Sequence, residues 1–316
     1  MSAPRIAFLG AGRMAIRQAQ ALVDAGLTPR SIVAVYDHDG AAARSFADRF
    51  GARAVSSRRA ALQAGSHVVI ATTAAAHATD AFEALQMRRG VFLEKPIALT
   101  VRDAAALTVL AERLGLSLHV GLSERFHPVV RALVAELEGR RAERFVASRC
   151  LPAMRARDCS VAMNLAVHDI DLALQIFRTP LTLERRTASR EPNAFHARFL
   201  GPQGEMVSIE AADGAAIPRR TLFVVAGNAT YEGDLLAGTL VRRVHGVPVA
   251  IPVGEREGLV VQAEALLAVW EGRTPHGPAT AREAFRGHAL VASAELQARA
   301  RSAQAPENLP PTASFG

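Results

Sequence analysis

The chain has 316 residues, of which 50% are hydrophobic and 21% are charged, with 23 glycines and 16 prolines. This composition is typical of a globular protein with one large or two medium domains, and it excludes a disordered, collagen-like or disulfide-stapled chain. The formal net charge of +7 comes from scattered basic pairs without interleaved aromatic residues, so we expect no nucleic-acid binding, but a field that helps an anionic small molecule approach.

Targeting signals and metal-ligand patterns are not found in the sequence. Its apolar runs are much shorter than the roughly twenty residues that cross a bilayer, and no signal-peptide pattern follows Met1, so we expect a cytoplasmic protein without a membrane anchor. Cys150 and Cys159 have no histidine or cysteine cluster at metal-ligand spacing. We therefore expect two thiols in a reducing compartment and no metal site.

The first part of the chain alternates short apolar runs with helical patterns. Strands are expected at Ile6 to Leu9, Ile32 to Tyr36, Val68 to Ala71, Val91 to Leu93 and Leu118 to Val120, and helices at Arg13 to Ala25, Gly40 to Phe50, Arg58 to Ala64, Ala78 to Met87 and Val101 to Leu114. Strands that are apolar at nearly every position are typical of a parallel sheet covered by helices on both faces. Residues 1–122 are therefore predicted to form an α/β, doubly wound Rossmann domain.

After Arg125 the pattern changes to an α+β arrangement. Helices are expected at Pro128 to Leu137, Met163 to Phe177, Gly258 to Trp270 and Ala281 to Arg301, and strands at Ala194 to Leu200, Met206 to Ala211, Leu222 to Ala226, Thr239 to Val244 and Val247 to Val253. Glycine, proline and asparagine separate these strands. We expect a second domain over residues 123–302 and a disordered tail over residues 303–316, which are rich in Pro, Ala and Ser and have no periodicity.

The first predicted strand ends in the turn Gly10-Ala-Gly12-Arg13-Met14-Ala15, which opens a helix. Gly10 permits a tight turn, Gly12 lets the backbone approach a pyrophosphate, and Ala15 keeps helix and sheet close. The free N–H groups of the helix N-terminus would face the anion. The alternative is a merely structural turn, but the position between strand and helix favours a dinucleotide site that includes Arg13 and Met14.

Asp37 follows the second strand, where an acidic residue can reach the ribose hydroxyls of a bound dinucleotide. Its carboxylate would repel a ribose phosphate, so NAD is favoured over NADP, although Arg13 and Arg44 could accommodate a phosphate. The alternative is a helix cap, because Asp37 and Asp39 both precede a helical segment.

Small and hydroxyl-bearing residues follow the third strand, from Ala71 through Thr72 and Thr73 to His77. At the carboxyl end of a parallel strand such residues are suited to line a cofactor cleft. Thr72, Thr73 and His77 are therefore candidates for cofactor binding, and Thr73 could instead cap a helix.

Lys95 is the single lysine among 37 lysines and arginines. Unlike arginine, lysine can pass a proton near neutral pH and presents a compact ammonium group. It lies in Glu94-Lys95-Pro96, directly after a strand, and the proline keeps it out of a helix. This position indicates a catalytic lysine in the ligand crevice, with Glu94 beside the cofactor. The alternative is one surface lysine that remains by chance.

Asn164 and His168 lie four residues apart in a segment with helical apolar spacing, so we expect them to share one helix face. A histidine there can act as an acid or base, whereas an asparagine can donate and accept hydrogen bonds but cannot carry a proton away. The alternative is that His168 is a structural or surface residue.

Together these motifs resemble the glucose–fructose oxidoreductase, inositol dehydrogenase and MocA (Gfo/Idh/MocA) family of nicotinamide-dependent sugar oxidoreductases. The resemblance covers almost the whole chain. It rests on Gly10-x-Gly12, Glu94-Lys95-Pro96, Val120-Gly121 with Arg125-Phe126-x-Pro128, and His168-Asp-Ile-Asp171.

The resemblance implies a Rossmann domain followed by an open, mostly antiparallel sheet whose exposed face commonly forms homodimers or homotetramers. It implies that Lys95 lies near the nicotinamide and the substrate hydroxyl, that His168 accepts the proton, and that Arg125 and Asn164 join them in the substrate site. The cofactor would take the hydride, while the protein would position the carbon and remove the hydroxyl proton.

One departure concerns Asn164, because many family members have an aspartate four residues before the histidine. Asparagine can orient His168 but cannot share a proton with it. A non-catalytic regulator that binds cofactor and ligand, or a reductase of imines or ketones, therefore stays open beside a sugar dehydrogenase.

A finer similarity involves Arg157-Asp158-Cys-Ser-Val and Arg178-Thr-Pro180-Leu. These segments resemble the subgroup that oxidises the 3-hydroxyl of UDP-N-acetylglucosamine to a 3-keto sugar nucleotide. The positive charge of the chain would suit a diphosphate. The best expectation is therefore an NAD(P)-dependent oxidoreductase of a sugar or sugar nucleotide.

Overall fold

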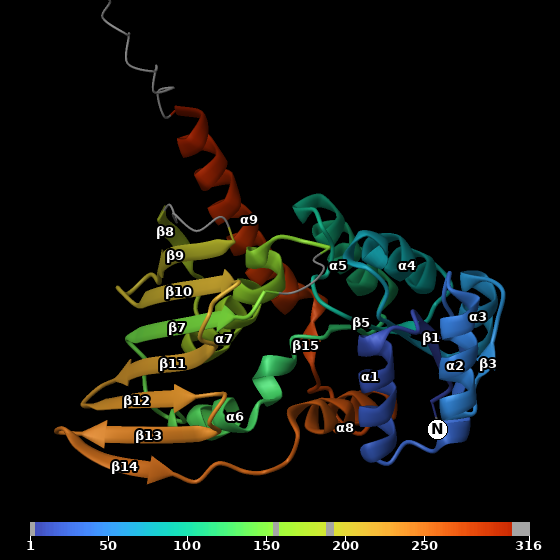
Figure 1. The fold of residues 1–316 in the computed structure, drawn as a ribbon, viewed down its shortest axis with the longest axis horizontal. Helices are drawn as coiled ribbons and strands as arrows, with labels where there is room; N and C mark the ends of the chain where they lie inside the picture. The colour runs from blue at the N-terminus through green and yellow to red at the C-terminus, as the bar shows by residue number, and fades with distance from the viewer. Residues whose placement is uncertain (1–3, 154–157, 188–192, 305–316) are drawn as a thin grey trace, which may run out of the picture.

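The computed structural model describes residues 4–153, 158–187 and 193–304. Two sheets lie side by side, one in the N-terminal half and one in the C-terminal half (Figure 1). This is the expected combination of a Rossmann sheet and an open, mostly antiparallel sheet. The division into domains at residues 1–122 and 123–302 remains our proposal. Arg157 and residues 305–316 lie outside the described part of the chain.

Sheet A has seven strands in the order β15-β6-β5-β4-β1-β2-β3. Its strands are β1 (Ile6–Leu9), β2 (Ile32–Tyr36), β3 (Arg53–Ala54), β4 (His67–Ile70), β5 (Gly90–Leu93), β6 (Leu118–Val120) and β15 (Ala279–Thr280). Its helices are α1 (Arg13–Asp24), α2 (Gly40–Phe50), α3 (Arg58–Ala64), α4 (Ala74–Gln86) and α5 (Val101–Leu114). All pairs are parallel except β15 with β6. The carboxyl ends of the parallel strands therefore share one edge of the sheet.

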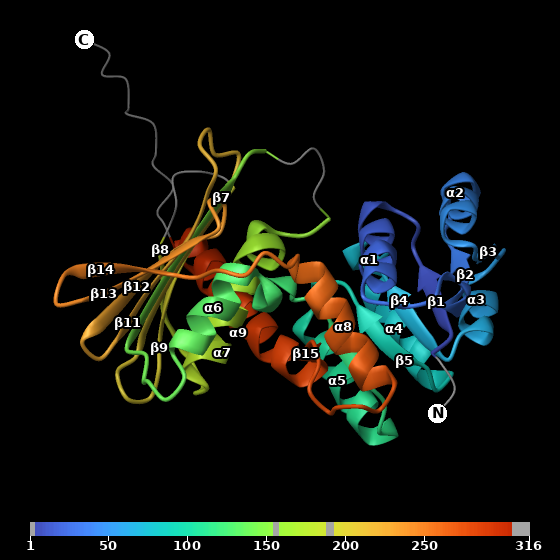
Figure 2. The ribbon, with the colours of Figure 1, turned by 90° about the horizontal axis from the view of Figure 1, so that it is seen from below.

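Sheet B has eight strands in the order β14-β13-β12-β11-β7-β10-β9-β8. Its strands are β7 (Arg144–Leu151), β8 (Thr182–Thr187), β9 (Ala194–Leu200), β10 (Met206–Asp213), β11 (Arg219–Ala226), β12 (Ala229–Asp234), β13 (Thr239–Val244) and β14 (Val247–Ile251). The remaining helices are α6 (Pro128–Glu136), α7 (Val167–Phe177), α8 (Gly258–Trp270) and α9 (Ala281–Gln304). Only β7 and β10 pair in parallel. Helices α6, α7 and α9 lie between sheet B and the Rossmann half (Figure 2).

Burial explains why the two sheets differ. Every residue of β1 and β5 is buried, as a sheet covered on both faces requires. Strands β9 and β10 largely alternate between buried and partly exposed residues, so the helices cover one face of sheet B and leave the other open. Among the described residues, no helix is both long and apolar enough to cross a membrane.

The C-terminal segment connects the two halves of the molecule. Helix α8 packs against α1, and the ring of Trp270 lies 4.7 Å from that of His67 at the start of β4. Strand β15 then joins sheet A, and α9 continues from α5 to α7 and β8. Segments 258–270 and 279–280 therefore complete the Rossmann half, although they follow sheet B in the chain.

Several predicted boundaries were wrong. Helix α4 begins at Ala74 rather than Ala78, because Thr73 is its N-cap residue and the alanines that follow form its first turn. Helix α9 continues to Gln304, so residues 303 and 304 are helical rather than part of a tail. The prediction also missed β3, β7, β8, β12 and β15. The two-residue strands β3 and β15 are too short to show periodicity, and β7 carries arginines among its apolar residues.

Candidate active site

The glycine turn joins β1 to α1 as expected. Gly10 has a φ of +94°, and a Cβ atom there would lie 2.5 Å from the carbonyl oxygen of Ala71, so only glycine fits. Gly12 is the N-cap residue of α1, and as a glycine it has no side chain that could cap the helix. Nothing lies within 4 Å of where its Cβ would be. Arg13 is exposed, Met14 is half-buried, and Ala15 is buried against the sheet. The turn therefore offers an open, uncapped helix N-terminus.

Asp37 lies at the end of β2, beside the glycine turn. Its Oδ2 accepts a hydrogen bond from the Ala11 N–H at 2.7 Å, and its Oδ1 accepts one from the Asp39 N–H at 2.9 Å. Asp39, not Asp37, is the N-cap residue of α2 and accepts hydrogen bonds from the Ala41 and Ala42 N–H groups. The capping alternative therefore applies to Asp39, whereas Asp37 is held next to the turn.

The segment after β4 carries three of the predicted cofactor-binding residues. Thr72 Oγ1 donates to the buried Asp80 carboxylate at 2.8 Å, and Thr73 occupies the N-cap position of α4 without a side-chain capping bond. His77 lies on α4, is only 2% exposed, and its Nδ1 is 2.7 Å from the Pro96 carbonyl oxygen. His77 therefore contacts the loop after Lys95 from within the protein instead of lining an open cleft.

Glu94 and Lys95 follow β5 at the carboxyl edge of sheet A. Glu94 is buried, and its Oε1 accepts a hydrogen bond from Gln18 Nε2 of α1 at 2.6 Å. Burial raises the pKa of Glu94, with Gln18 and Lys95 opposing this effect. Gly121 at the end of β6 leaves room for this carboxylate, because a Cβ there would lie 3.0 Å from Glu94 Oε2. Gln18 holds the Glu94 carboxylate in place, and the sequence analysis missed this residue of the site.

The ammonium group of Lys95 faces the second half of the molecule. Its Nζ donates to the backbone carbonyl oxygen of Asn164 at 2.9 Å and to Asn164 Oδ1 at 2.5 Å. Burial lowers the pKa of Lys95, and the neighbouring Glu94 opposes that shift. The structure thus brings together Lys95 and Asn164, two of the three predicted catalytic residues.

Asn164 and His168 lie on one continuous helical segment, but its first turn is not α-helical. Residues Ala162–Ala166 form a π-helical turn that continues directly into α7. Such turns are rare and occur frequently at functional sites. His168 is in the first turn of α7, is 7% exposed, and its buried Nδ1 has no hydrogen-bond partner in the described part of the protein.

Positive charges surround His168. Burial is the main reason that its pKa lies well below the ordinary value, and the charges of Lys95 and Arg149 lower it further. The carboxylate of Glu124 acts in the opposite direction. The imidazole of His168 is therefore neutral at pH 7 and can accept a proton.

A buried ion-pair cluster fixes the start of α7. Arg149 of β7 donates two hydrogen bonds to Asp169, from Nε at 2.9 Å and from Nη2 at 2.7 Å. Its Nη1 donates to Glu124 Oε1 at 3.2 Å, and Arg220 of β11 donates to Glu124 Oε2. Asp169 directly follows His168, so this cluster orients the histidine. The sequence analysis missed the cluster, because its members lie far apart in the chain.

Arg125 forms a separate ion pair at the other side of α7. Its Nε and Nη2 donate to the Asp171 carboxylate at 2.7 and 2.6 Å, and its Nη1 donates to Glu283 of α9 at 3.2 Å. Its side chain is 11% exposed. Arg125 belongs to η2 (Ser123–Phe126) and connects it to α7 and α9. Its guanidinium therefore holds these helices together in the structure.

The two cysteines have different surroundings, and both are free thiols. Cys150 lies on β7 beside Ser148 and Arg219. Cys159 is close to Lys95 and Asp158, and burial is the main cause that raises its pKa to about 11. Asp158 Oδ2 accepts a hydrogen bond from the Ala74 N–H at 2.7 Å, so the segment before α7 contacts the start of α4.

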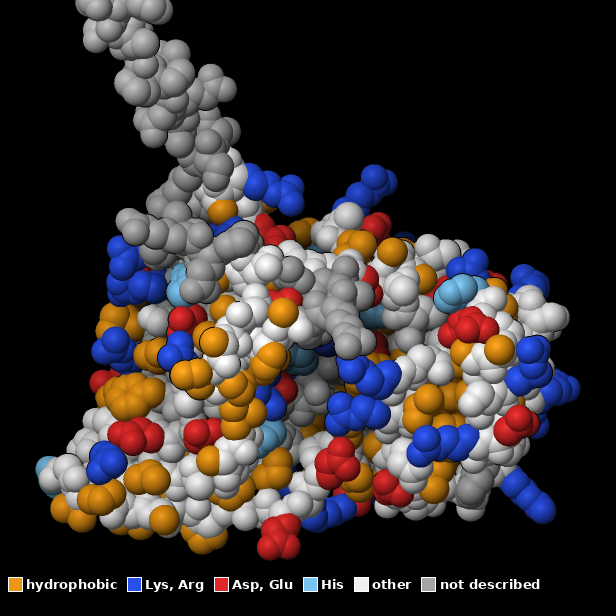
Figure 3. All heavy atoms as spheres, in the orientation of Figure 1, with side chains coloured by type: hydrophobic (Ala, Val, Ile, Leu, Met, Phe, Trp, Pro, Cys, Tyr) orange, Lys and Arg blue, Asp and Glu red, His pale blue; other side chains and the backbone are white. Residues whose placement is uncertain are grey.

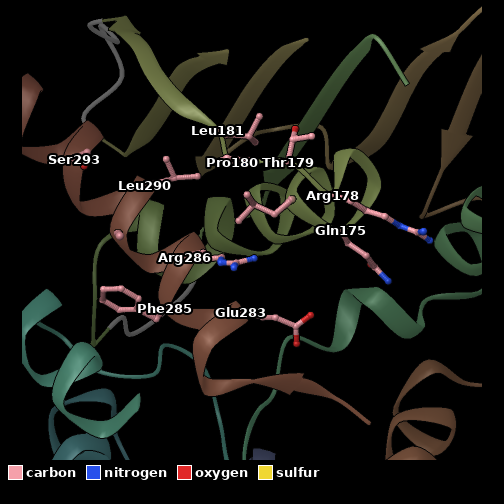
Figure 4. A pocket seen from close by; sticks show the side chains of 12 residues that line it. Gln175, Arg178, Thr179, Pro180, Leu181, Glu283, Phe285, Arg286, Leu290 and Ser293 are labelled. Atoms are coloured by element: carbon pink, nitrogen blue, oxygen red, sulfur yellow. The ribbon is translucent and has the colours of Figure 1, made fainter. Parts of the chain in front are cut away.

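The surface is hollowed between the two halves of the molecule, with basic side chains at the edge of the hollow (Figure 3). A separate pocket of about 690 Å³ lies between the C-terminal end of α7 and α9. There Arg286 and Glu283 extend from α9 toward the side formed by α7 (Figure 4). Lys95, Asn164 and His168 do not line this pocket, so it is distinct from the candidate active site.

Comparisons with known proteins agree with this fold. Residues 4–122 match the family model GFO_IDH_MocA, an oxidoreductase family with an NAD-binding Rossmann fold. UDP-N-acetylglucosamine 3-dehydrogenase of Acidithiobacillus ferrooxidans is 31% identical over 145 residues, which are 45% of this chain and 46% of that enzyme. The chain thus aligns with about half the length of this curated relative.

Solved structures share the fold over nearly the whole chain. The structure of the same Acidithiobacillus ferrooxidans enzyme has a TM-score of 0.85 and 23% identity, covering 94% of this chain and 98% of that one. An oxidoreductase from Agrobacterium radiobacter in complex with NAD+, L-tartaric acid and magnesium has a TM-score of 0.80 and 17% identity, covering 94% and 97%. A 3-ketoreductase from Actinomadura kijaniata in complex with TDP-benzene and NADP has a TM-score of 0.78 and 19% identity, covering 94% and 98%.

The fold and the glycine turn define the class: a protein with an NAD-binding type of Rossmann fold and a second, mostly antiparallel sheet. Over residues 4–122 the match supports the resemblance to the Gfo/Idh/MocA oxidoreductase family seen in the sequence.

Proposed function

We propose that this protein transfers a hydride between a nicotinamide cofactor and a hydroxyl or ketone carbon of a sugar or sugar nucleotide. The 3-hydroxyl of a UDP-N-acetylhexosamine is the substrate we favour. The observation that carries the proposal is the pair of hydrogen bonds from Lys95 Nζ to Asn164, which joins the carboxyl edge of sheet A to the helix that bears His168. The 31% identical relative named UDP-N-acetylglucosamine 3-dehydrogenase supports this substrate.

The residues at the carboxyl edge of sheet A fit a dinucleotide. The positive φ of Gly10, the open space at Gly12 and the uncapped start of α1 suit a pyrophosphate, and Asp37 lies where a ribose would be. The surroundings of the cofactor would be completed by Arg13, Met14, Thr72, Thr73 and Glu94. When bound, the nicotinamide would accept or supply the hydride.

Lys95 and His168 would handle the proton. The neutral imidazole of His168 accepts the hydroxyl proton of the substrate as the hydrogen on carbon leaves with its electron pair. Two oxygens of Asn164 hold the Lys95 ammonium, and its remaining N–H can stabilise the developing alkoxide. In the reverse direction the same groups would return the proton to the ketone oxygen.

We propose NAD as the preferred cofactor, because the carboxylate of Asp37 would repel the 2′-phosphate of NADP. Solved proteins of the same fold include complexes with each cofactor, so the fold alone does not set the preference. Replacing Asp37 by Ser should weaken NAD binding by about tenfold, or about 1.4 kcal/mol, and narrow the difference between the two cofactors. Fluorescence titration of both reduced cofactors measures this, and an unchanged NAD affinity would contradict the assignment.

We also propose a homodimer or homotetramer formed through the open face of sheet B. The partly exposed residues on this face include the apolar Val146, Phe223 and Val225. Such residues suit contact between copies of the chain. Light scattering of the purified protein tests this proposal.

The decisive experiment follows nicotinamide absorbance when the protein is mixed with NAD or NADP and UDP-N-acetylglucosamine or free sugars. Formation of NADH with the nucleotide sugar would support the reaction, the cofactor and the substrate together. If cofactor binds but no hydroxyl substrate reacts, the dehydrogenase proposal is wrong. Oxidation of NADH by ketones or imines would then indicate a reductase, and ligand binding without turnover would indicate a regulator.

A further inference from the structure

Four charged side chains from four different elements meet next to His168. They are Glu124 of η2, Arg149 of β7, Asp169 of α7 and Arg220 of β11. Arg149 is 4% exposed and connects the group, because it donates to both Asp169 and Glu124. The cluster therefore joins the loop after sheet A to two strands of sheet B at the helix that carries His168.

The two carboxylates of this cluster have different hydrogen-bond partners. Both oxygens of Asp169 accept hydrogen bonds from Arg149, so its charge is matched by one guanidinium. Glu124 accepts one hydrogen bond from Arg149 and one from Arg220. Burial would raise the pKa of Glu124, but Arg149, His168 and Arg220 more than offset this and bring it to about 2. Glu124 is therefore ionised throughout the pH range in which the protein would work.

The charges that act on His168 come from several elements. Lys95 after β5, Arg149 on β7 and Arg220 on β11 are cations, and each opposes protonation of the imidazole. Asn164, one turn earlier on the same helix, is neutral, and its Oδ1 accepts a hydrogen bond from Lys95. Glu124 is the carboxylate that favours the imidazolium. A base surrounded by three cations needs such a countercharge when it takes up a proton.

We propose that Glu124 is a positioning residue for the reaction, because its carboxylate lies in the ion-pair cluster that orients His168 and compensates the charge formed when His168 accepts the substrate proton. The inference rests on the proposed function. In this step the O–H bond of the substrate breaks, an N–H bond forms on His168, and the O–H electron pair forms the C=O bond. The hydrogen on the carbon would leave with its electron pair as the hydride that an oxidised nicotinamide would take up. Glu124 stays ionised and takes up no proton.

Substitution of Glu124 by Gln tests the charge with little change in shape. The amide oxygen can still accept from Arg149, but the countercharge is lost. We expect kcat for hydroxyl oxidation to fall by about 10- to 100-fold with KM changed less than about threefold, since the effect develops only as the proton moves. Glu136→Gln is the matched control, because Glu136 pairs with Arg242 at 2.9 Å and is absent from the cluster. The control should keep the wild-type kcat.

A rescue variant separates the charge effect from damage to the fold. Adding Asn164→Asp to Glu124→Gln puts a carboxylate one turn before His168. We expect it to recover at least about tenfold of the lost kcat. If Glu124→Gln leaves kcat within twofold of the wild type, or if the double variant recovers nothing, the proposal is overturned.

A titration of the His168 imidazole by NMR, without substrate, makes this test independent of the proposed reaction. Arg220→Gln removes a cation and should raise the His168 pKa, which makes it easier to measure. Adding Glu124→Gln in that background should lower it again by about one unit. A rise or no change on adding Glu124→Gln would overturn the proposal. If the expected shifts occur but no sugar substrate reacts, the electrostatic role of Glu124 is retained and the proposed function fails.

Discussion

Lys95 Nζ lies 2.9 Å from the backbone carbonyl oxygen of Asn164 and 2.5 Å from its Oδ1, although 69 positions separate the two residues in the chain. One contact fixes the lysine to the backbone of the π-helical turn, and the other fixes it to the side chain of Asn164 in the same turn. Because the same helical segment continues to His168, the two hydrogen bonds set the position of the ammonium group relative to the imidazole. A movement of sheet A relative to α7 would change the lengths of both hydrogen bonds together.

Replacing Lys95 by Met should abolish turnover while leaving the cofactor site intact. The change removes the donor to Asn164 and the ammonium that would stabilise an alkoxide, so we expect kcat to fall by about 10³-fold. The affinity for NAD should stay within about threefold. Steady-state absorbance and NADH fluorescence titration measure the two quantities. Residual activity within tenfold of the wild type would contradict a catalytic role for Lys95.

The two glycines of the first turn should respond differently to alanine. Gly10→Ala places a Cβ 2.5 Å from the Ala71 carbonyl oxygen at a φ of +94°, so we expect a loss of about 3 kcal/mol of folding stability. Gly12→Ala meets no atom within 4 Å and should change the stability by less than about 1 kcal/mol, but weaken NAD binding at least tenfold. Denaturant unfolding and cofactor titration distinguish the two variants. Equal losses of stability would count against this difference.

The Arg149–Asp169 pair should show strong energetic coupling. Replacing Arg149 by Met or Asp169 by Leu leaves a buried charge without its partner, and each change should cost about 3–5 kcal/mol. The double variant removes both charges, so its loss should be smaller than the sum by at least about 2 kcal/mol. A double-mutant cycle in urea measures this coupling. Strictly additive losses would show that the pair does not act as a unit.

His288 should make folding stability sensitive to acid. It is 1% exposed on α9, neither ring nitrogen has a hydrogen-bond partner in the described part of the protein, and burial lowers its pKa to about 4. Since the unfolded chain protonates near pH 6.5, the unfolded state binds the extra proton between pH 6.5 and 4, and stability falls as the pH falls.

Substitution of His288 by Leu isolates this contribution. The difference in slope between wild type and variant should approach about 1.4 kcal/mol per pH unit in that window, with the wild type losing stability faster. His276→Gln, at an exposed position, is the control and should keep the wild-type slope. Unfolding free energies at pH 4.5, 5.5 and 7 measure the effect. Parallel curves for the wild type and the His288 variant would refute the assignment.

The Rossmann half was largely predictable from sequence. Its fully apolar strands and the Gly10 turn depend on neighbours within a few residues, so periodicity and the glycine spacing were enough to locate β1, β2 and α1. The isolated lysine was also visible, since composition alone distinguishes Lys95 from 36 arginines. The start of α4 was not located, because the alanines after Thr73 were interpreted as small residues that line a cleft, although alanine is the strongest helix former.

Other properties depend on contacts that only the folded chain makes. Whether Asp37 or Asp39 caps α2 was settled by which carboxylate reaches the helix amides, and β15 joins sheet A although it follows sheet B in the chain. The ion-pair cluster could not be foreseen, since Glu124, Arg149 and Arg220 come from a loop and two strands with no shared sequence pattern. The sequence by itself determined the class of fold and the positions of the glycine turn and of the lysine after their strands, because these depend on local pattern. The tertiary structure decided which charges surround His168, because burial and distance between remote residues set its pKa.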